Sequence, residues 1–189
     1  EVRGLQRLAG GAPLGGELHR DEPGAPRGGQ ASDAGINRVG ASADMQAGQT
    51  DGAGHVAAAA KAAGARVLVH VSAIGADSNS ASAYGRSKGD GEAAVRAAFA
   101  DAAILRPSTL FGREDQFINR FAAMMRMTPV VPVIAPNAKF QPVYVGDVAD
   151  AVVAALGKGA AGKTFELGGP QVLTMGELLR WIASATGRS

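Results

Sequence analysis

The stretch RVLVHVS, residues 66–72, decides the fold that the rest of the chain can adopt. Its valines and leucine form a short run rich in β-branched side chains, which is typical of a strand buried in a parallel sheet. The alanine-rich residues 54–63 before it predict a helix, and Gly64 is suited to the position that ends one. A helix followed closely by a buried strand is typical of an α/β protein, and this is the fold class that we expect.

The same alternation continues along the chain after Ser72. Residues 81–98 predict a helix, and residues 102–105 predict a strand that ends at Arg106 and Pro107. Five further elements are predicted: a helix over residues 115–126 with Phe117 and Phe121 on one face, an extended segment over 140–145, a helix over 146–156, a strand over 164–167, and a helix that the capping box from Thr174 to Glu177 opens. Strands that alternate with helices in this way indicate a parallel sheet.

Residues 1–50 differ in composition from everything that follows. They contain eleven glycines and three prolines, no lysine and no aromatic residue, and they show neither a helical nor a strand periodicity. Such a segment loses much conformational entropy on ordering and has little apolar surface to offset that loss. It is either a flexible leader or an amino-terminal half that has been damaged, for example by a shifted reading frame, and we favour the second interpretation.

The composition argues against several classes of function. The 189 residues suit one domain, and the 19 basic and 17 acidic side chains give a formal net charge of +2 without a basic run, so no nucleic-acid partner is expected. The chain has no cysteine, and its three histidines lack metal-ligand spacing, so no metal site is predicted. No apolar run approaches the roughly 18 residues of a transmembrane helix, so any contact with a membrane would be peripheral.

Tyr84 and Lys88 are the first candidates for chemistry. Residues four apart on a helix lie on one face, one turn from each other. A phenol normally titrates near about 10, too high for free proton exchange at neutral pH, but a neighbouring ammonium favours the phenolate and lowers its pKa. The pair therefore suits a tyrosine acid/base, and Lys88 could also donate a hydrogen bond to a ribose hydroxyl. The alternative is a solvated helix face that carries no chemistry.

Two further segments place polar groups where predicted strands end. Ser72 closes its strand twelve residues before Tyr84, and the carboxyl edge of a parallel sheet is where ligands bind. Its hydroxyl could donate a hydrogen bond to a substrate carbonyl, unless the residue only begins the loop that follows. The segment LRPSTLFG, residues 105–112, can offer backbone donors to a carboxamide, and its alternative interpretation is a plain connecting loop.

These segments, in this order, resemble a known family. Five blocks are similar to those of the extended short-chain dehydrogenase/reductases, which are NAD-dependent epimerase/dehydratase-like proteins. The blocks are residues 57–64, VLVHVS, the Tyr84-x-x-x-Lys88 spacing, ILRPSTLFG and QPVYVGDVADAV (residues 141–152). FGRED followed by QFINRFAAM, residues 111–124, resembles more narrowly an atypical branch of that family. This branch contains the nucleotide-binding accessory subunit of respiratory complex I. The resemblance covers residues 51–187.

The resemblance implies a Rossmann-like parallel sheet with a small carboxy-terminal region, and NAD or NADP as the cofactor. Tyr84 would be the acid/base, Lys88 would hold the nicotinamide ribose, and Ser72 would orient a substrate carbonyl. The nicotinamide would be lined by Pro107, Ser108 and Thr109. Residues 51–189 would accordingly form a partial NAD(P)-binding domain with a substrate or docking region at its carboxyl end.

The resemblance leaves three functions open. The first is a nucleotide-binding accessory or assembly subunit of NADH:ubiquinone oxidoreductase (complex I), with other complex I subunits as partners and with a structural nucleotide. The second is an enzyme, an NAD(P)-dependent reductase or epimerase acting on a carbonyl or a sugar nucleotide. The third is a non-functional fragment of either. We expect a cytoplasmic protein, with peripheral association at the inner membrane if the first function holds.

The chain departs from the family where the pyrophosphate of the cofactor should bind. Members open with a strand and a Gly-x-x-Gly-x-x-Gly turn, which brings backbone donors at a helix amino terminus to the pyrophosphate. No such turn follows a strand in this sequence, and residues 33–40 resemble only a worn copy of the family's fourth strand. We therefore expect a sheet that is incomplete on its amino-terminal side and weak binding of NAD(P). Gly85 and Gly89 should also weaken the Tyr84 helix, by about 1 kcal/mol each relative to alanine.

Overall fold

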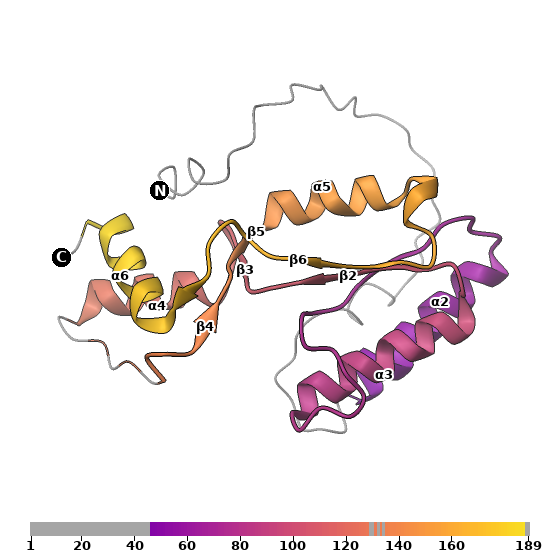
Figure 1. Ribbon diagram of the computed structural model, residues 1–189, viewed down its shortest axis with the longest axis horizontal. Helices are drawn as coiled ribbons and strands as arrows, with labels where there is room; N and C mark the ends of the chain where they lie inside the picture. The colour runs from indigo at the N-terminus through magenta and orange to yellow at the C-terminus, as the bar shows by residue number, and fades with distance from the viewer. Residues whose placement is uncertain (1–45, 129–130, 132, 134, 188–189) are drawn as a thin grey trace.

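The computed structural model of the protein describes residues 46–128, 131, 133 and 135–187. The segment predicted to be degenerate or disordered, residues 1–50, lies outside the described residues except for its last five, and so does the predicted strand remnant at 33–40. Within the described ranges, the chain forms a layered α/β unit and a small carboxyl-terminal lobe (Figure 1).

Three parallel strands form the main sheet, in the spatial order β1-β2-β6. Their bounds are Val69–Val71 for β1, Ala103–Pro107 for β2 and Thr164–Leu167 for β6. The middle strand is β2, and its residues Ala103, Ile104 and Leu105 are almost completely buried. The predicted α/β class with a parallel sheet is confirmed.

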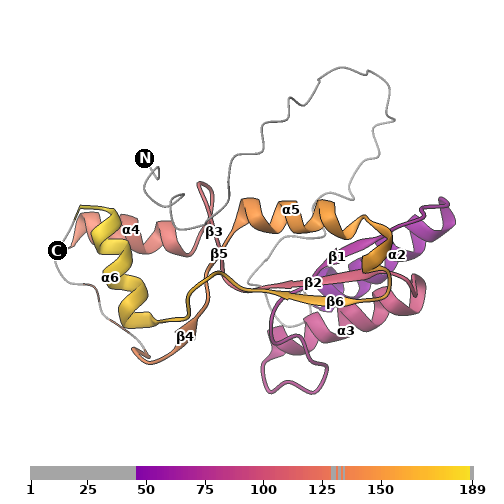
Figure 2. The same ribbon diagram turned by 45° about the horizontal axis from the view of Figure 1, so that its top comes forward.

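Helices cover both faces of this sheet (Figure 1 and Figure 2). On one face lie α2 (Gly52–Ala62), which follows the π-helical turn η2 (Gln46–Asp51), and α3 (Ala83–Ala98). The other face carries α5 (Val145–Ala155), which leads into the 3-10 turn η3 (Lys158–Ala160). One buried cluster joins α2, α3 and the start of β2: Ala57, Val95, Phe99 and Ala102. A second joins the sheet to α5 and η3: Ala103, Leu105, Ala155 and Ala160.

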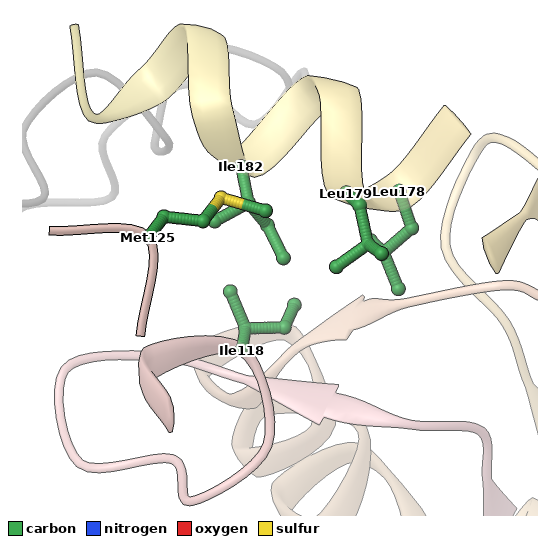
Figure 3. Close-up of a cluster of buried hydrophobic side chains, with 5 residues drawn as sticks. All are labelled: Ile118, Met125, Leu178, Leu179 and Ile182. Carbon is green, nitrogen blue, oxygen red and sulfur yellow. The ribbon is translucent and has the colours of Figure 1, made fainter. Parts of the chain in front are cut away.

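The carboxyl-terminal lobe has a core of its own. It combines α4 (Ile118–Met127) and α6 (Met175–Ala185) with an antiparallel strand pair, β4 (Lys139–Phe140) and β7 (Leu173–Thr174). The parallel pair β3 (Leu110–Phe111) and β5 (Val143–Tyr144) lies between this lobe and the main sheet (Figure 1). The buried side chains of the lobe come from α4 and α6 and point toward one another (Figure 3): Ile118, Met125, Leu178, Leu179 and Ile182.

The predicted end of α2 at Gly64 is confirmed. Gly64 has a φ of +75°, a conformation that favours glycine. The N–H of Gly64 donates to the carbonyl of Lys61, and the N–H of Ala65 donates to the carbonyl of Ala60. These two bonds form a Schellman motif, which satisfies the last carbonyls of the helix and turns the chain toward β1.

Two side-chain predictions in the carboxyl-terminal lobe are also confirmed. Thr174 accepts a hydrogen bond from the N–H of Glu177, and the Glu177 carboxylate accepts one from the N–H of Thr174 at 2.8 Å, so the capping box opens α6. The rings of Phe117 and Phe121 lie on one face, with their centroids 5.3 Å apart and their planes nearly perpendicular.

The strand predicted at residues 66–72 is shorter and less buried than expected. Only Val69–Val71 form β1, and the side chain of Val71 is 42% exposed. The reason is that β1 is an edge strand among the described residues, since β2 is its only neighbour there. The ladder nevertheless extends by one bond, because the N–H of Ser72 donates to the carbonyl of Leu105 at 2.7 Å.

Arg106 and Pro107 were expected to end the second strand, but they belong to it. They pair with Glu166 and Leu167 of β6. Proline is tolerated here because it occupies the last position of the strand, and its carbonyl accepts a hydrogen bond from the N–H of Ile74 at 3.1 Å. The middle strand therefore extends two residues further toward the candidate site than the sequence indicated.

Two boundaries in the carboxyl-terminal lobe also differ from the prediction. The helix expected from residue 115 begins at Ile118, because the carboxylate of Asp115 accepts hydrogen bonds from the N–H groups of Ile118 and Asn119 and so caps the helix. The extended segment expected over 140–145 is divided between β4 and β5, which belong to different sheets.

The glycines of α3 allow neighbouring backbone to approach this helix closely. A methyl group on Gly89 would collide with the backbone of Asp77 and Ser78, and one on Gly91 would lie 2.6 Å from the carbonyl oxygen of Gln49. On Gly85 it would lie 2.6 Å from the hydroxyl oxygen of Ser80. These glycines lower the helix propensity of α3, but they allow the loop before α3 and the turn η2 to pack closely against the helix.

We predict that Gly89→Ala destabilises the protein by about 1 to 3 kcal/mol, because the added methyl forces the backbone of Asp77 and Ser78 away from α3. Urea unfolding followed by circular dichroism measures the change. Gly176→Ala is the matched control, since its methyl would meet only the carbonyl oxygen of Pro136 at 3.9 Å. The control should be neutral or stabilising by up to about 1 kcal/mol. A Gly89→Ala protein as stable as the control would contradict the packing argument.

Candidate functional site

Tyr84 and Lys88 lie one turn apart on α3, near its amino terminus. Ser82 caps the helix and accepts a hydrogen bond from the N–H of Gly85. The ammonium nitrogen of Lys88 is 5.8 Å from the centroid of the Tyr84 ring. The expected proximity of the two side chains is therefore present, but it takes the form of a cation above a ring.

The electrostatics of Tyr84 differ from the expectation. We expected the Lys88 ammonium to lower the pKa of the phenol, but burial raises the pKa of Tyr84 above its ordinary value. The physical reason is that burial penalises the phenolate, while the ammonium lies over the ring and has no resolved effect on the phenol. Burial lowers the pKa of Lys88, and the negative charge of Glu92 opposes that shift.

Ser72 follows β1 directly, at the carboxyl edge of the sheet. Only 4% of the residue is exposed. Its hydroxyl oxygen is buried and has no partner in hydrogen-bonding geometry within the described part of the chain. Glu92 is nevertheless close enough for Ser72 to help lower the pKa of its carboxyl. A buried hydroxyl without a full partner is unusual, and the role of Ser72 toward a substrate carbonyl stays a prediction.

Glu92 and Arg106 form the strongest polar contact of this region. The guanidinium of Arg106 donates two hydrogen bonds to the Glu92 carboxylate, both 2.8 Å long. Arg106 also lies 3.6 Å from Glu166 on β6. Burial opposes ionisation of Glu92, but the hydrogen bonds from Arg106 and the contribution of Ser72 outweigh it, so the pKa of Glu92 is lowered. The pair ties α3 to the central strand β2.

His70 completes a group of polar side chains between β1, β2 and α3. Burial, and then the positive charge of Lys88, lower the pKa of His70, while Glu92 opposes the shift. His70 and Ser72 are two residues apart on extended chain, so their side chains lie on the same face of the sheet. Lys88 and Glu92 are one turn apart on α3, so they lie on the same face of that helix. We call this group the buried polar cluster: His70, Ser72, Lys88, Glu92 and Arg106.

The segment Pro107–Thr109 lies where β2 leads into β3. The N–H of Ser108 donates to the carbonyl of Leu167 at 2.8 Å, so it is not available to a ligand. The carbonyl of Thr109 accepts from Val143, whereas the N–H of Thr109 has no partner among the residues that the structure describes. Of the backbone donors expected here, Thr109 is thus the one that remains for a carboxamide. The roles of Pro107, Ser108 and Thr109 toward a nucleotide stay predictions.

Three members of the buried polar cluster were missed in the sequence. Glu92 is four residues beyond Lys88, so the rule that placed Tyr84 and Lys88 on one helix face also places Glu92 there. Arg106 was noted only as the end of a strand, although an arginine beside a buried strand needs an acidic partner. No local signal distinguishes His70 from any other polar residue in a strand.

The described residues lack two other kinds of feature. No helix of the described chain is long and apolar enough to cross a membrane. Across residues 46–128, 131, 133 and 135–187, no group of three His, Cys, Asp or Glu side chains is placed to hold a metal ion.

The parallel sheet, the serine at the end of β1 and the Tyr84–Lys88 pair define a protein of the short-chain dehydrogenase/reductase type. Residues 41–188 match the family described as the RmlD substrate binding domain. This chain belongs to that family. The resemblance proposed from the sequence is therefore confirmed, since the match covers both the sheet and the carboxyl-terminal lobe.

Relatives place the chain near the branch that the sequence indicated. It is 42% identical over 137 residues to NADH dehydrogenase (ubiquinone) 1 alpha subcomplex subunit 9, mitochondrial, of Mus musculus, a match that covers 71% of this chain and 36% of that protein. The protein of the same name from Arabidopsis thaliana is 44% identical over 113 residues, which is 58% of this chain and 28% of that one. The chain thus spans about a third of the length of these curated relatives.

A solved structure gives the same fold at low sequence identity. The dTDP-glucose 4,6-dehydratase of Streptomyces venezuelae, crystallised with NAD, superposes with a TM-score of 0.69 at 20% identity. The match covers 79% of this chain and 53% of that one. The likeness confirms the Rossmann-like arrangement of the sheet.

We predict that Glu92→Gln lowers the free energy of unfolding at pH 7 by about 2 to 3 kcal/mol, because Arg106 loses its charged, bidentate partner. The pKa of Glu92 is lower in the folded protein, so its contribution is present above the ordinary value of about 4.3 and is lost as pH falls through the lowered value. The difference between variant and parent should therefore shrink in urea unfolding curves below about pH 4.

Glu166→Gln is the control for this experiment. Glu166 also lies near Arg106, but its side chain is 58% exposed, against 8% for Glu92. Its loss should change stability by no more than about 1 kcal/mol. Equal losses in the two variants would show that the buried bidentate pair is not what holds α3 to β2.

Proposed function

We propose that this protein is a nucleotide-binding accessory or assembly subunit of NADH:ubiquinone oxidoreductase (complex I). The observation that carries the proposal is the 42% identity over 137 residues to a protein named as a complex I subunit. That alignment is long enough to include most of the described sheet and the carboxyl-terminal lobe. The partners of the protein would then be other complex I subunits.

Tyr84 and Lys88 suit the holding of a nucleotide. The ammonium of Lys88 lies 5.8 Å from the centroid of the Tyr84 ring, and 40% of Tyr84 is exposed to solvent. Both side chains can therefore donate hydrogen bonds to a ribose, and a structural nucleotide requires no more of them.

The proposed cofactor is NAD or NADP, and the described residues suit its nicotinamide half. Ser72 offers a buried hydroxyl without a full partner, Thr109 offers a backbone N–H, and Lys88 offers an ammonium for ribose hydroxyls. When bound, the nicotinamide would supply hydride chemistry if the protein is catalytic. The described residues form no Gly-x-x-Gly-x-x-Gly turn that could hold the pyrophosphate. We therefore propose that this chain binds the nucleotide weakly.

The second candidate function is an NAD(P)-dependent reductase or epimerase acting on a carbonyl or sugar nucleotide. It is favoured by the pairing of Tyr84 with Lys88 on α3 and by the buried Ser72 at the carboxyl end of β1, although Ser72 approaches Glu92 and no contact joins it to Tyr84 among the described residues. In that case Tyr84 would transfer the proton and Ser72 would orient the carbonyl. Bound nicotinamide, with its positive charge, would have to lower the pKa of Tyr84 that burial raises.

For the complex I function, we propose a cytoplasmic protein held at the inner membrane through its protein partners. Expressed with a carboxyl-terminal tag in the cell that encodes it, the protein should migrate with NADH:ubiquinone oxidoreductase activity on native electrophoresis of gently solubilised membranes. The untagged strain provides the control for unspecific capture. Migration apart from every complex I subunit would contradict the proposal, and turnover of a carbonyl compound by the purified protein would support the enzymatic alternative.

We predict that the chain binds NADH and NADPH with dissociation constants in the millimolar range or weaker, equivalent to about −4 kcal/mol or less favourable. The pyrophosphate needs several backbone donors at a helix amino terminus to replace its water, and one lysine with a few neutral groups cannot supply them. Isothermal titration calorimetry measures the affinity.

Any residual binding should depend on one lysine and not on another. Lys88→Ala should abolish the residual binding. Lys61 lies on α2, with its ammonium over the ring of Phe99, and Lys61→Ala should leave the binding unchanged. Micromolar binding of either nucleotide would mean that a phosphate site exists in this chain, and the weak-binding proposal would be wrong.

A further inference from the structure

A separate pocket lies beside the short strand pair β3 and β5, between the carboxyl-terminal lobe and the first turn of α5. It has a volume of about 50 Å³ and is mostly apolar. It shares no residue with the candidate nucleotide site. Its lining is Phe111, Pro142, Tyr144, Asp147, Pro170, Gln171, Leu173 and Trp181.

Three aromatic rings from three different elements form the walls of this pocket. The centroid of Phe111 is 5.6 Å from that of Tyr144, with the planes tilted by 52°, and 6.0 Å from that of Trp181, with the planes at 80°. The three rings contact one another in this way and form one continuous aromatic part of the lining. The cation–ring contacts of the described chain involve other rings, so no described lysine or arginine occupies this space.

Asp147 is the only charged side chain in the lining. It stands in the first turn of α5, where the positive end of the helix dipole favours a carboxylate. It is exposed, and neither a hydrogen bond nor an ion pair joins its carboxylate to a described residue. The pocket therefore combines aromatic faces with one uncompensated negative charge, which is the combination that attracts an organic cation.

We propose that this pocket binds a small quaternary ammonium compound. A water molecule needs roughly 10 to 15 Å³ of such volume, so about 50 Å³ accommodates about four heavy atoms. A trimethylammonium group has this size. A primary ammonium is strongly hydrated and would need several acceptors, whereas a quaternary ammonium is weakly hydrated and gains from aromatic faces without donating hydrogen bonds.

The single tryptophan of the chain makes the proposal testable without labelling. Trp181 is the only tryptophan among the 189 residues, and it lines the pocket, so its fluorescence reports occupancy. Choline is the probe, and its uncharged isostere, in which carbon replaces the quaternary nitrogen, is the control for apolar binding. We expect a saturable response to choline and a response to the isostere that is weaker by about tenfold.

Two aspartate variants distinguish the site from a general charge effect. Asp147→Asn should weaken choline binding by about fivefold to tenfold, because it removes the charge from the pocket. Asp150→Asn changes the net charge equally, one turn further along α5 and outside the lining, and should alter the affinity less than twofold. Because neither nucleotide nor complex I takes part, the result is independent of the proposed function.

A third variant tests the aromatic walls. Tyr144→Leu keeps the pocket apolar but removes one ring, and it should reduce the preference for choline over the isostere by about twofold, since Asp147 and the other two rings remain. Circular dichroism of each variant confirms that it is folded before titration. Three outcomes would overturn the proposal. They are equal binding of choline and its isostere by the parent protein, the absence of any saturable response, and an unchanged affinity in Asp147→Asn.

Discussion

The ion pair between Glu92 and Arg106 is the interaction on which the rest of the candidate site depends. It joins α3 to the central strand of the sheet through two parallel hydrogen bonds. Charges buried in this way are stable only when their partners are in place, because desolvation of a single charge costs several kcal/mol. Lys88 precedes Glu92 by one helical turn, and Ser72 approaches the same carboxylate, so both residues lie next to the pair.

The glycines of α3 set how closely this helix can meet its surroundings. Gly85 and Gly89 admit the loop that follows β1, and Gly91 admits η2. Partial burial shifts the pKa values of Tyr84 and Lys88 on this helix, and 40% of Tyr84 remains exposed. The glycines therefore fix the helix backbone against its neighbours and leave the Tyr84 side chain accessible.

The carboxyl-terminal lobe brings a second set of functional groups to the carboxyl edge of the sheet, beyond the ends of β2 and β6. Its α4–α6 core is independent of the main sheet, and it is connected to it through the short pair β3 and β5. Short strands with few hydrogen bonds leave space between side chains, and the aromatic pocket beside Asp147 occupies such a space. The molecule can therefore serve different ligands at two separate places, the nucleotide near α3 and an organic cation near the first turn of α5.

The sequence by itself determined the elements and their class, because the signals for these are local. The stop of α2 at Gly64, the capping box at Thr174 and the spacing of Tyr84 and Lys88 each depend on residues within five positions of one another. Only the tertiary structure decided the exposed face of β1, the raised pKa of Tyr84, the partnership of Glu92 with Arg106 and the closure of Phe111, Tyr144 and Trp181 around Asp147. Burial and dielectric environment are set by segments distant in the chain, so no window of sequence contains them.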